Sequence, residues 1–424
     1  MAAAGRLLLL VPTQSYRAED FLAAARRLGV PVLVGTDRCH RIEEAFGPSE
    51  GLLSIDYRKP EEAAAEIVRE AARLPIAGVV PADDGTAVIA ALAAERLGLP
   101  RNSPAAARRT VNKLAQREAL AAAAVPVPWF HAFPVAGGPE GPASAVPYPC
   151  VLKPLGLSGS RGVIRADDSD SFGEAWRRIV AILSAARSDR KAREGGEGSQ
   201  ILVEAFVPGA EVALEGLLRG GRLELLALFD KPDPLDGPYF EETIYVTPSR
   251  HSPGIQEAVL KSVASAADAL GLREGPVHAE ARLGPGGPVV LEVAARTIGG
   301  LCARALRFGA GASLEELVVA HAVGLPLASI RREGRASGVM MLPIPRRGIL
   351  HGVAGLEAAR AAPGVDDVVI TVPEGREVVP LPEGDAYLGF LFARGESPGE
   401  VEGSLREAHR RLSFDIRAPL PTVR

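Results

Sequence analysis

The chain has 424 residues, of which 47% are hydrophobic and 24% are charged. A chain of this length and apolar content can form two or three domains with buried cores, which excludes an intrinsically disordered protein. The net charge is −4 and the pI is near 6.1, so a nucleic acid is a poor candidate partner and a small molecule is a better one. The three cysteines, Cys39, Cys150 and Cys302, lie far apart without C-x-x-C spacing. They predict neither a disulfide framework nor a zinc site, and they fit a reducing cytoplasm.

The N-terminal part of the chain alternates predicted strands with predicted helices. The apolar run at 7–12 is too short for a signal sequence or a membrane span and predicts a first strand at 7–11. The next segments are predicted in the order helix 18–29, strand 30–35, helix 60–74, strand 76–83 and helix 85–98. This alternation predicts a Rossmann-like parallel sheet with helices on its faces, in a domain at 1–110.

Ligands of such sheets bind beyond the carboxyl ends of the strands, where residues 13–17 and 83–86 are expected. The fingerprint G-x-G-x-x-G is missing after the first strand, and no Walker A sequence occurs in the chain. These absences argue against a Rossmann dehydrogenase and against a P-loop NTPase.

Two lysines and a glycine-rich segment form the next group of candidates. Lys113 begins an alanine-rich helix that ends before Pro126, and alone it would be an ordinary surface charge. Lys153 ends a short apolar strand in "YPCVLKPLGLSGSRG". The residues that follow it are small and polar: Gly156, Ser158, Gly159, Ser160 and Gly162. Such a loop can bring backbone N–H groups close to phosphate oxygens, although glycine clusters are also common in simple hairpin turns.

Several acids end apolar runs further along the chain. In "QILVEAFVPGAEVALEG" a strand at 201–203 leads into Glu204, and a second strand begins at Glu211 after a Pro-Gly turn. The segments "HAEARL" and "LEVAARTIGG" carry Glu280 and Glu292, and the second continues to Arg296. Taken singly, these groups could equally be solvent-exposed acids on edge strands and a surface ion pair.

In this order, the two lysines, the glycine loop and the acidic segments resemble the ATP-grasp superfamily, which includes biotin carboxylase, D-alanine:D-alanine ligase and the L-amino-acid ligases. The likeness extends from about residue 5 to 415 and is nearest to the L-amino-acid ligases. It implies an ATP-grasp domain of two α+β subdomains at 111–324, of which the smaller, at about 145–208, covers the nucleotide. An α+β closing domain is expected at 325–424, with Arg335 and Arg394 as candidate substrate residues.

The resemblance implies roles at the nucleotide site. Lys113 and Lys153 would contact the phosphates of ATP, and the glycine loop would close over the β- and γ-phosphates. Glu204 and the backbone of Phe206 and Val207 would line the adenine edge. Glu211 would accept hydrogen bonds from the ribose hydroxyls.

The resemblance also implies a metal and a catalytic arginine. Glu280 and Glu292 would hold Mg²⁺, with Mn²⁺ as an alternative ion, because hard cations favour carboxylate oxygens. Ala294 replaces the asparagine of the E-x-N-P-R pattern that many members carry, so one usual metal oxygen is missing. Arg296 and Lys153 are the expected catalytic cations, and Arg296 would stabilise a phosphate or a substrate carboxylate.

Candidate substrate residues lie in two further places. His278 precedes Glu280 by two residues and shares its face of a strand, although a lone histidine is more often structural. Gly299 and Gly300 follow Arg296 and are candidates with it. The turn-rich segment 228–250, which also contains Lys231 and Tyr245, contributes Glu241 and Glu242 as candidates; its alternative interpretation is an ordinary long hairpin loop.

The implied activity is an ADP-forming ligation of a small-molecule carboxylate, expected to be an amino acid or a related acid, to an amine through an acyl phosphate. One alternative is biotin-carboxylase-like activation of bicarbonate, which needs a biotinylated partner; no M-K-M sequence of a biotin carrier occurs in this chain. Another alternative is a nucleotide-binding protein without turnover. Neither a nucleic acid nor a membrane is an expected partner, a homodimer is left open, and a cytoplasmic location is expected.

Overall fold

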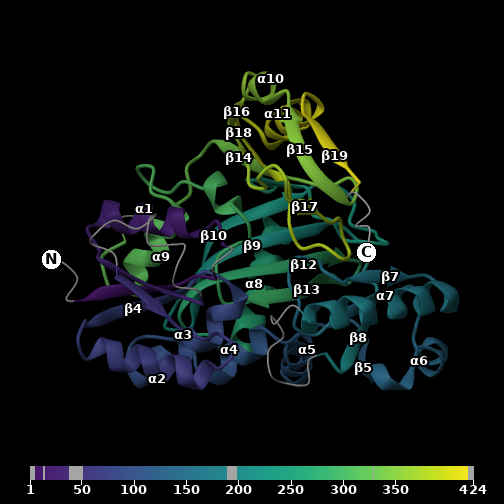
Figure 1. Cartoon of the computed structure of the whole chain (residues 1–424), viewed down its shortest axis with the longest axis horizontal. Coiled ribbons are helices and arrows are strands. Elements are labelled where there is room, and N and C mark those ends of the chain that lie inside the picture. Colours follow the sequence, from purple (N-terminus) through teal and green to yellow (C-terminus); the bar gives the residue numbers. More distant parts are fainter. Residues whose placement is uncertain (1–4, 13–14, 38–50, 189–197, 328, 419–424) are drawn as a thin grey trace, which may run out of the picture.

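The computed structural model describes residues 5–12, 15–37, 51–188, 198–327 and 329–418. In Figure 1 the N-terminal parallel sheet lies at one side of the molecule and a small antiparallel sheet lies at the other. A large antiparallel sheet lies between them, and the C-terminal strands continue this sheet at the top of the view. The mixture of parallel α/β and antiparallel α+β units confirms the predicted fold class.

The N-terminal sheet is parallel and has the order β3-β2-β1-β4. Its elements follow one another as β1 (Arg6–Leu10), α1 (Ala18–Leu28), β2 (Val32–Thr36), β3 (Gly51–Ser54), α2 (Pro60–Ala71), β4 (Ile76–Pro81) and α3 (Asp84–Arg96). Leu7 and Leu9 pack with α1, whereas Leu8 and Leu10 pack with α2 and α3, so helices cover both faces. The predicted Rossmann-like sheet is therefore confirmed. The short strand β3 is an addition to the prediction.

The small sheet has the order β5-β8-β6-β7, and each neighbouring pair is antiparallel. Helices α4 (Pro104–Thr110) and α5 (Lys113–Ala122) precede it. Its strands and helices are β5 (Phe130–Pro134), α6 (Glu140–Ala145), β6 (Cys150–Pro154), β7 (Ile164–Ala166), α7 (Ser169–Ser188) and β8 (Gln200–Ala205). Strand β5 lies before the predicted limit near residue 145, so the sheet begins earlier than expected.

The large sheet has the order β13-β12-β9-β10-β11-β14-β18-β16. Its first part contains β9 (Glu211–Arg219), β10 (Arg222–Lys231), β11 (Ile244–Thr247), α8 (Pro253–Leu270), β12 (Gly275–Gly284), β13 (Gly287–Ala294) and α9 (Leu314–Ala322). Its second part contains β14 (Ala336–Leu342), β16 (Val365–Ile370), β18 (Gly389–Gly395) and α11 (Pro398–Arg410). Tyr245 of β11 pairs with Val339 of β14, so a single sheet crosses the predicted boundary at residue 325. The domain boundaries themselves stay predictions.

A third antiparallel sheet, of order β17-β15-β19, completes the C-terminal part. It consists of β15 (Gly348–Ala354), β17 (Glu377–Val378) and β19 (Ser413–Arg417), and α10 (Leu356–Arg360) lies between β15 and β16 in the sequence. Within the described ranges, no helix is long and apolar enough to cross a membrane.

Candidate active site

A cavity of about 450 Å³ lies where the N-terminal sheet, the small sheet, the large sheet and the C-terminal segment meet. Most of the predicted site residues line it together: Lys113, Lys153, Ser158, Gly159, Ser160, Glu204, Phe206, Val207, Glu211, Glu242, His278, Glu280, Glu292, Arg296, Gly299 and Gly300. The cavity also contains Ser15, Tyr16, Arg17, Asp83 and Asp84, from the sheet edge that was predicted to bind a ligand. Thr13 and Gln14 of that prediction lie outside the described residues.

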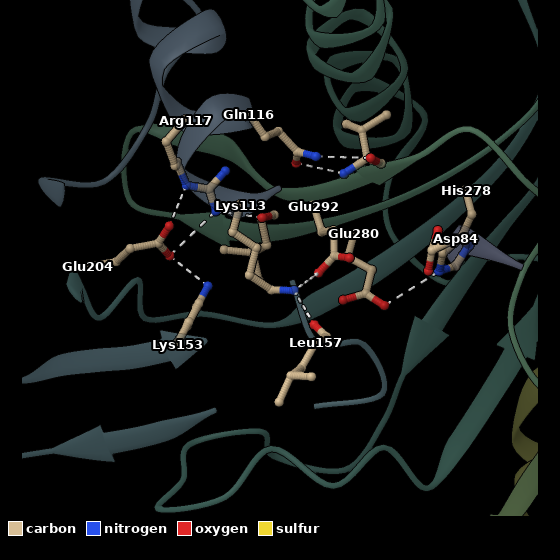
Figure 2. A network of polar contacts seen from close by, with 12 residues as sticks. Asp84, Lys113, Gln116, Arg117, Lys153, Leu157, Glu204, His278, Glu280 and Glu292 are labelled. Atoms are coloured by element: carbon tan, nitrogen blue, oxygen red, sulfur yellow. Dashed lines mark hydrogen bonds and ion pairs between the residues drawn. The ribbon is translucent and has the colours of Figure 1, made fainter. Parts of the chain in front are cut away.

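One end of the cavity is organised around the buried carboxylate of Glu204. Arg117 Nε lies 2.5 Å from Glu204 Oε1, and Lys153 Nζ lies 2.6 Å from Oε2 (Figure 2). Burial alone would raise the pKa of Glu204, but the charges of Arg117 and Lys153 outweigh burial and lower it to about 2. The two cations exceed the single acid by one positive charge. Glu204 lines the cavity as predicted, and its contact with adenine stays a prediction.

Arg117 was not predicted, because it reads as one more charge in an alanine-rich helix. It lies one helical turn after Lys113 on α5, and it also donates to the carbonyls of Val290 and Leu291 in β13. The neighbouring Gln116 donates to Val293 O at 3.0 Å and accepts from Val293 N at 2.9 Å. Helix α5 therefore holds β13 at the point where Glu292 enters the cavity (Figure 2).

Lys113 connects the glycine loop with the acidic part of the site. Asn112 caps α5 by accepting from Ala115 N, which places Lys113 at the first position of the helix. The Nζ atom of Lys113 donates to Leu157 O at 2.6 Å and lies 3.6 Å from Glu292 Oε2 (Figure 2). A single ammonium group thus lies between the loop and one of the two predicted metal ligands.

The glycine loop faces the cavity through its middle residues, Ser158, Gly159 and Ser160. Gly162 has φ +73, and a Cβ there would lie 2.7 Å from Pro154 Cγ, so this position requires glycine. Gly156 and Gly162 do not line the cavity, and their predicted phosphate contacts stay predictions. The loop is fixed to the C-terminal segment, because Gly162 N donates to Pro382 O at 2.9 Å.

The two predicted metal ligands lie opposite each other on neighbouring strands. Glu280 of β12 pairs with Glu292 of β13, so both carboxylates are on the same face of the sheet. Their side chains are 23% and 33% exposed, toward the cavity. Paired carboxylate oxygens that face a cavity fit a hard divalent cation. Ala294, which is only 2% exposed, adds no side-chain oxygen to them.

Glu280 also belongs to a group with Glu211 and Glu242, in which carboxylate oxygens lie within 4.8 Å of one another. Lys231 contacts all three acids of this group. Its Nζ lies 2.7 Å from Glu211 and 3.4 Å from Glu280, and it donates to Glu242 as well. Burial alone would lower the pKa of Lys231, but the three carboxylates raise it well above its usual value.

Lys231 occupies the last position of β10, and the connecting segment that holds Glu242 is limited to 232–243. Residues 228–231 and 244–247 of the predicted loop at 228–250 are therefore strand. Glu211 forms ion pairs with both Lys231 and Arg282, and Arg282 Nε lies 3.0 Å from Glu211 Oε2. The predicted contact of Glu211 with ribose stays a prediction. Glu241 does not line the cavity, in contrast to Glu242.

His278 is held between two acids. Its Nδ1 lies 2.5 Å from Glu215 Oε1, and its Nε2 lies 3.4 Å from Glu280 Oε1. Burial alone would lower the pKa of His278, but Glu215 and then Glu280 raise it to about 9, so the ring carries a positive charge at neutral pH. Glu215, opposite His278 in the strand pairing and fully buried, was not predicted because its partner depends on the strand register.

Arg296 forms a two-point ion pair with the N-terminal domain. Its Nε and Nη2 lie 2.9 and 2.8 Å from the two carboxylate oxygens of Asp84, and its Nη1 donates to Thr297 O at 2.9 Å. Burial would lower the pKa of Arg296, but Asp84 outweighs burial and raises it. Asp84 begins α3 at the carboxyl edge of the parallel sheet, so this pair links the two domains across the cavity.

The C-terminal part lines the cavity through Met341, Asp385, Ala386 and Tyr387. The two arginines predicted from this region lie elsewhere. Arg335 forms an exposed ion pair with Glu396, and Arg394 lies 2.6 Å from Asp366. Neither lines the cavity, because both face partners within the C-terminal part.

Comparison with known families finds three matching domains along the chain. Residues 146–305 match the ATP-grasp domain, and residues 22–101 match the ATP-grasp N-terminal domain. Residues 340–417 match L-amino acid ligase C-terminal domain 2. The chain belongs to the ATP-grasp superfamily. The predicted family is thereby confirmed.

Individual ATP-grasp proteins resemble the chain over most of its length. The crystal structure of an L-amino acid ligase from Bacillus licheniformis is 25% identical and has a TM-score of 0.77, over 98% of this chain and 100% of that one. Carnosine synthase 1 of Homo sapiens is 29% identical over 374 residues, which are 84% of this chain and 45% of that protein. Alanine–anticapsin ligase of Bacillus subtilis is 24% identical over 257 residues, which are 58% of this chain and 53% of that protein. The chain thus spans less than half the length of the carnosine synthase that it matches.

Proposed function

We propose that this ATP-grasp protein is an ADP-forming carboxylate–amine ligase that joins an amino acid or a related acid to an amine. One observation carries the proposal: a single cavity is lined by two lysines, by a pair of acids and by an arginine that an ion pair holds in place. The lysines are Lys113 and Lys153, the acids are Glu280 and Glu292, and the arginine is Arg296. The L-amino acid ligase C-terminal domain and the named ligases among the relatives support this activity.

The charges at the nucleotide end suit a phosphate chain. Arg117 alone neutralises Glu204, so the ammonium of Lys153 is the surplus charge that a phosphate can use. Lys113 and the backbone N–H groups of the glycine loop would contact the same phosphates. The position of these residues in the cavity and the family of the chain support these roles.

Glu280 and Glu292 would hold a divalent cation, Mg²⁺ or alternatively Mn²⁺. When bound, such an ion neutralises phosphate oxygens and lowers the barrier to phosphoryl transfer. The surrounding residues prepare the acids for it. Lys231 and His278 lower the pKa of Glu280 against the effect of burial and so keep it ionised. The positive charge of Lys113 lies 3.6 Å from the carboxylate of Glu292.

The reaction then needs two bond exchanges. A carboxylate oxygen of the acid attacks the γ-phosphorus of ATP, the bond to the β-phosphate oxygen breaks, and ADP leaves. The amine attacks the carbonyl carbon of the acyl phosphate, phosphate leaves with the bonding pair, and the amine loses a proton. Arg296, held in place by Asp84, is positioned to stabilise the negative oxygens of both steps. The glycine loop, fixed to the C-terminal segment, would keep water from the acyl phosphate.

The experiment is phosphate release from ATP and Mg²⁺ with pairs of amino acids, amino acids with simple amines, and bicarbonate with biotin, followed by mass spectrometry. Release that needs both an acid and an amine, with a product mass equal to their sum minus water, supports the ligase. Release with bicarbonate and biotin would favour the carboxylase alternative. ATP binding without release under any condition would favour a binding protein. The cytoplasmic location and the homodimer stay predictions.

A further inference from the structure

A buried arginine on the cavity wall has no acidic partner within the part of the chain that the structure describes. Arg17 immediately precedes α1 and is 7% exposed. Its Nη1 donates to Ala82 O at 2.5 Å, and its Nη2 donates to the hydroxyl of Thr297. Among the residues that the structure describes, no carboxylate oxygen lies within the 4.0 Å of an ion pair from Arg17. Both of its bonded partners are neutral.

The other buried cations around the cavity differ from Arg17 in this respect. Arg117 pairs with Glu204, Lys231 and Arg282 pair with Glu211, and Arg296 pairs with Asp84. A buried charge without a counter-ion is costly, because hydration is lost and no Coulomb attraction replaces it. Arg17 is such a charge with respect to the described residues, and it lines the cavity. A ligand anion that occupies the cavity would supply the missing partner.

The position of Arg17 within the cavity limits which anion this can be. Lys113 lies beside Glu292, at the nucleotide end. Arg296 and Arg17 share a partner, because Arg296 donates to the carbonyl of Thr297 and Arg17 donates to the hydroxyl of the same residue. Burial and then the charge of Arg296 lower the pKa of Arg17, as expected for neighbouring cations. Arg17 therefore lies beside Arg296, and its two bonded partners, Ala82 and Thr297, belong neither to the glycine loop nor to the lysines at the nucleotide end.

This inference rests on the proposed ligase activity. When an acid is joined to an α-amino acid, one carboxylate is consumed at the phosphate and the other is retained in the product. The retained carboxylate stays charged throughout, so it needs a permanent cation away from the γ-phosphate. We propose that Arg17 binds this retained α-carboxylate, which makes α-amino acids, rather than simple amines, the amine substrates.

The walls next to Arg17 are suited to the rest of such a substrate. Tyr16 packs edge-on against Phe390 of β18, with ring centroids 5.8 Å apart, and its ring also lines the cavity. Tyr387 and Met341 line the cavity from the C-terminal part. The amino acid would thus lie between the segment before α1 and the C-terminal segment, with its amine directed toward the centre at Arg296.

The test compares matched pairs of amine substrates that differ only in the carboxylate, such as alanine with alaninamide and phenylalanine with phenylalaninamide. The full-length wild type is first assayed for ligation, which tests the proposed function separately. The value of kcat/KM for each member of a pair is then measured for the wild type, Arg17→Met, Arg17→Lys and the control Arg27→Met. Arg27 also lies on the N-terminal domain, where it forms an exposed ion pair with Glu316 of α9 away from the cavity.

The wild type should prefer the free amino acid over its carboxamide by about 10- to 100-fold, the usual effect of one charged hydrogen bond. Arg17→Met should remove this preference, chiefly by raising KM for the amino acid, and Arg17→Lys should restore part of it. Arg27→Met should keep it. Differences in the intrinsic reactivity of the amines cancel, because the same pairs are used with every enzyme.

Three results would overturn the inference. The first is a wild type that ligates both members of each pair equally well after kcat/KM is corrected for the fraction of unprotonated amine, which needs no variant and so does not depend on the variant folding. The second is an unchanged preference in a folded Arg17→Met protein that binds ATP normally. The third is an effect of Arg17→Met on KM for the activated acid alone, which would place Arg17 at the consumed carboxylate.

Discussion

Glu204 has two cationic partners, and replacing each of them by methionine should have opposite consequences. Lys153→Met leaves the pair of Arg117 and Glu204 intact, so the folded state should lose at most about 1 kcal/mol, while nucleotide binding loses a cation. Arg117→Met removes the fully buried partner, which is 2% exposed and also satisfies two carbonyls of β13. Its main effect should be on stability.

The expected sizes follow from the contacts. Breaking a buried ion pair by removing one partner costs about 3–5 kcal/mol. The lowering of the pKa of Glu204 from 4.5 to about 2 corresponds to roughly 3 kcal/mol, to which Arg117 and Lys153 both contribute. A charged hydrogen bond to phosphate contributes about 1.5–3 kcal/mol, so Lys153→Met should weaken ATP binding by roughly 10- to 150-fold.

Urea denaturation followed by circular dichroism, and titration with ATP and Mg²⁺, measure the two effects. Arg117→Met should shift the denaturation midpoint strongly, and Lys153→Met should raise the Kd for ATP. A stability loss of equal size in both variants would refute this division of roles. So would an unchanged ATP affinity in Lys153→Met, which would remove that lysine from the nucleotide site.

Three further predictions concern acids of the site. Glu292→Gln should abolish turnover while the folded protein keeps its wild-type circular dichroism spectrum, and an active variant with normal metal dependence would contradict the metal assignment. Asp84→Asn should lower kcat/KM by about 10- to 100-fold, because Arg296 loses a charged two-point partner. Steady-state kinetics measure this loss, and an unchanged kcat/KM would contradict the role given to Asp84. Glu204→Gln tests the pH dependence. The folded pKa of Glu204 lies near 2, below its unfolded value of 4.5, so its stabilising contribution is complete above pH 4.5 and is lost as the pH falls through 2. The stability difference between wild type and Glu204→Gln should therefore be largest at pH 7 and shrink at pH 3, and a difference independent of pH would argue against an ionised Glu204.

Local patterns allowed the alternating N-terminal elements to be predicted, because each strand and helix carries its own hydrophobic period. Strand β3 (Gly51–Ser54) escaped prediction because it is short and only partly buried. The shared sheet across residue 325 could not be predicted either. It depends on the pairing of β11 with β14, segments that are far apart in the sequence, and no local pattern specifies such a pairing.

The residues of the site also divide into those that local sequence patterns predict and those that depend on long-range contacts. Glu280, Glu292 and Arg296 were predicted because they occur in short motifs whose spacing is characteristic of a family. Arg117 and Glu215 were missed because their roles come from partners on other elements, Glu204 and His278. A buried ion pair has no signature in either of its two local sequences. It becomes visible only when the strand register and the helix orientation are known.

The identity of the products formed from ATP, Mg²⁺ and defined acid and amine pairs tests the proposed reaction most directly. Equal amounts of ADP, phosphate and a condensed product should appear, only when acid and amine are both present, and Glu292→Gln should form none of them. Phosphate release that proceeds without an amine, or a product that carries carbon from bicarbonate, would contradict a carboxylate–amine ligase.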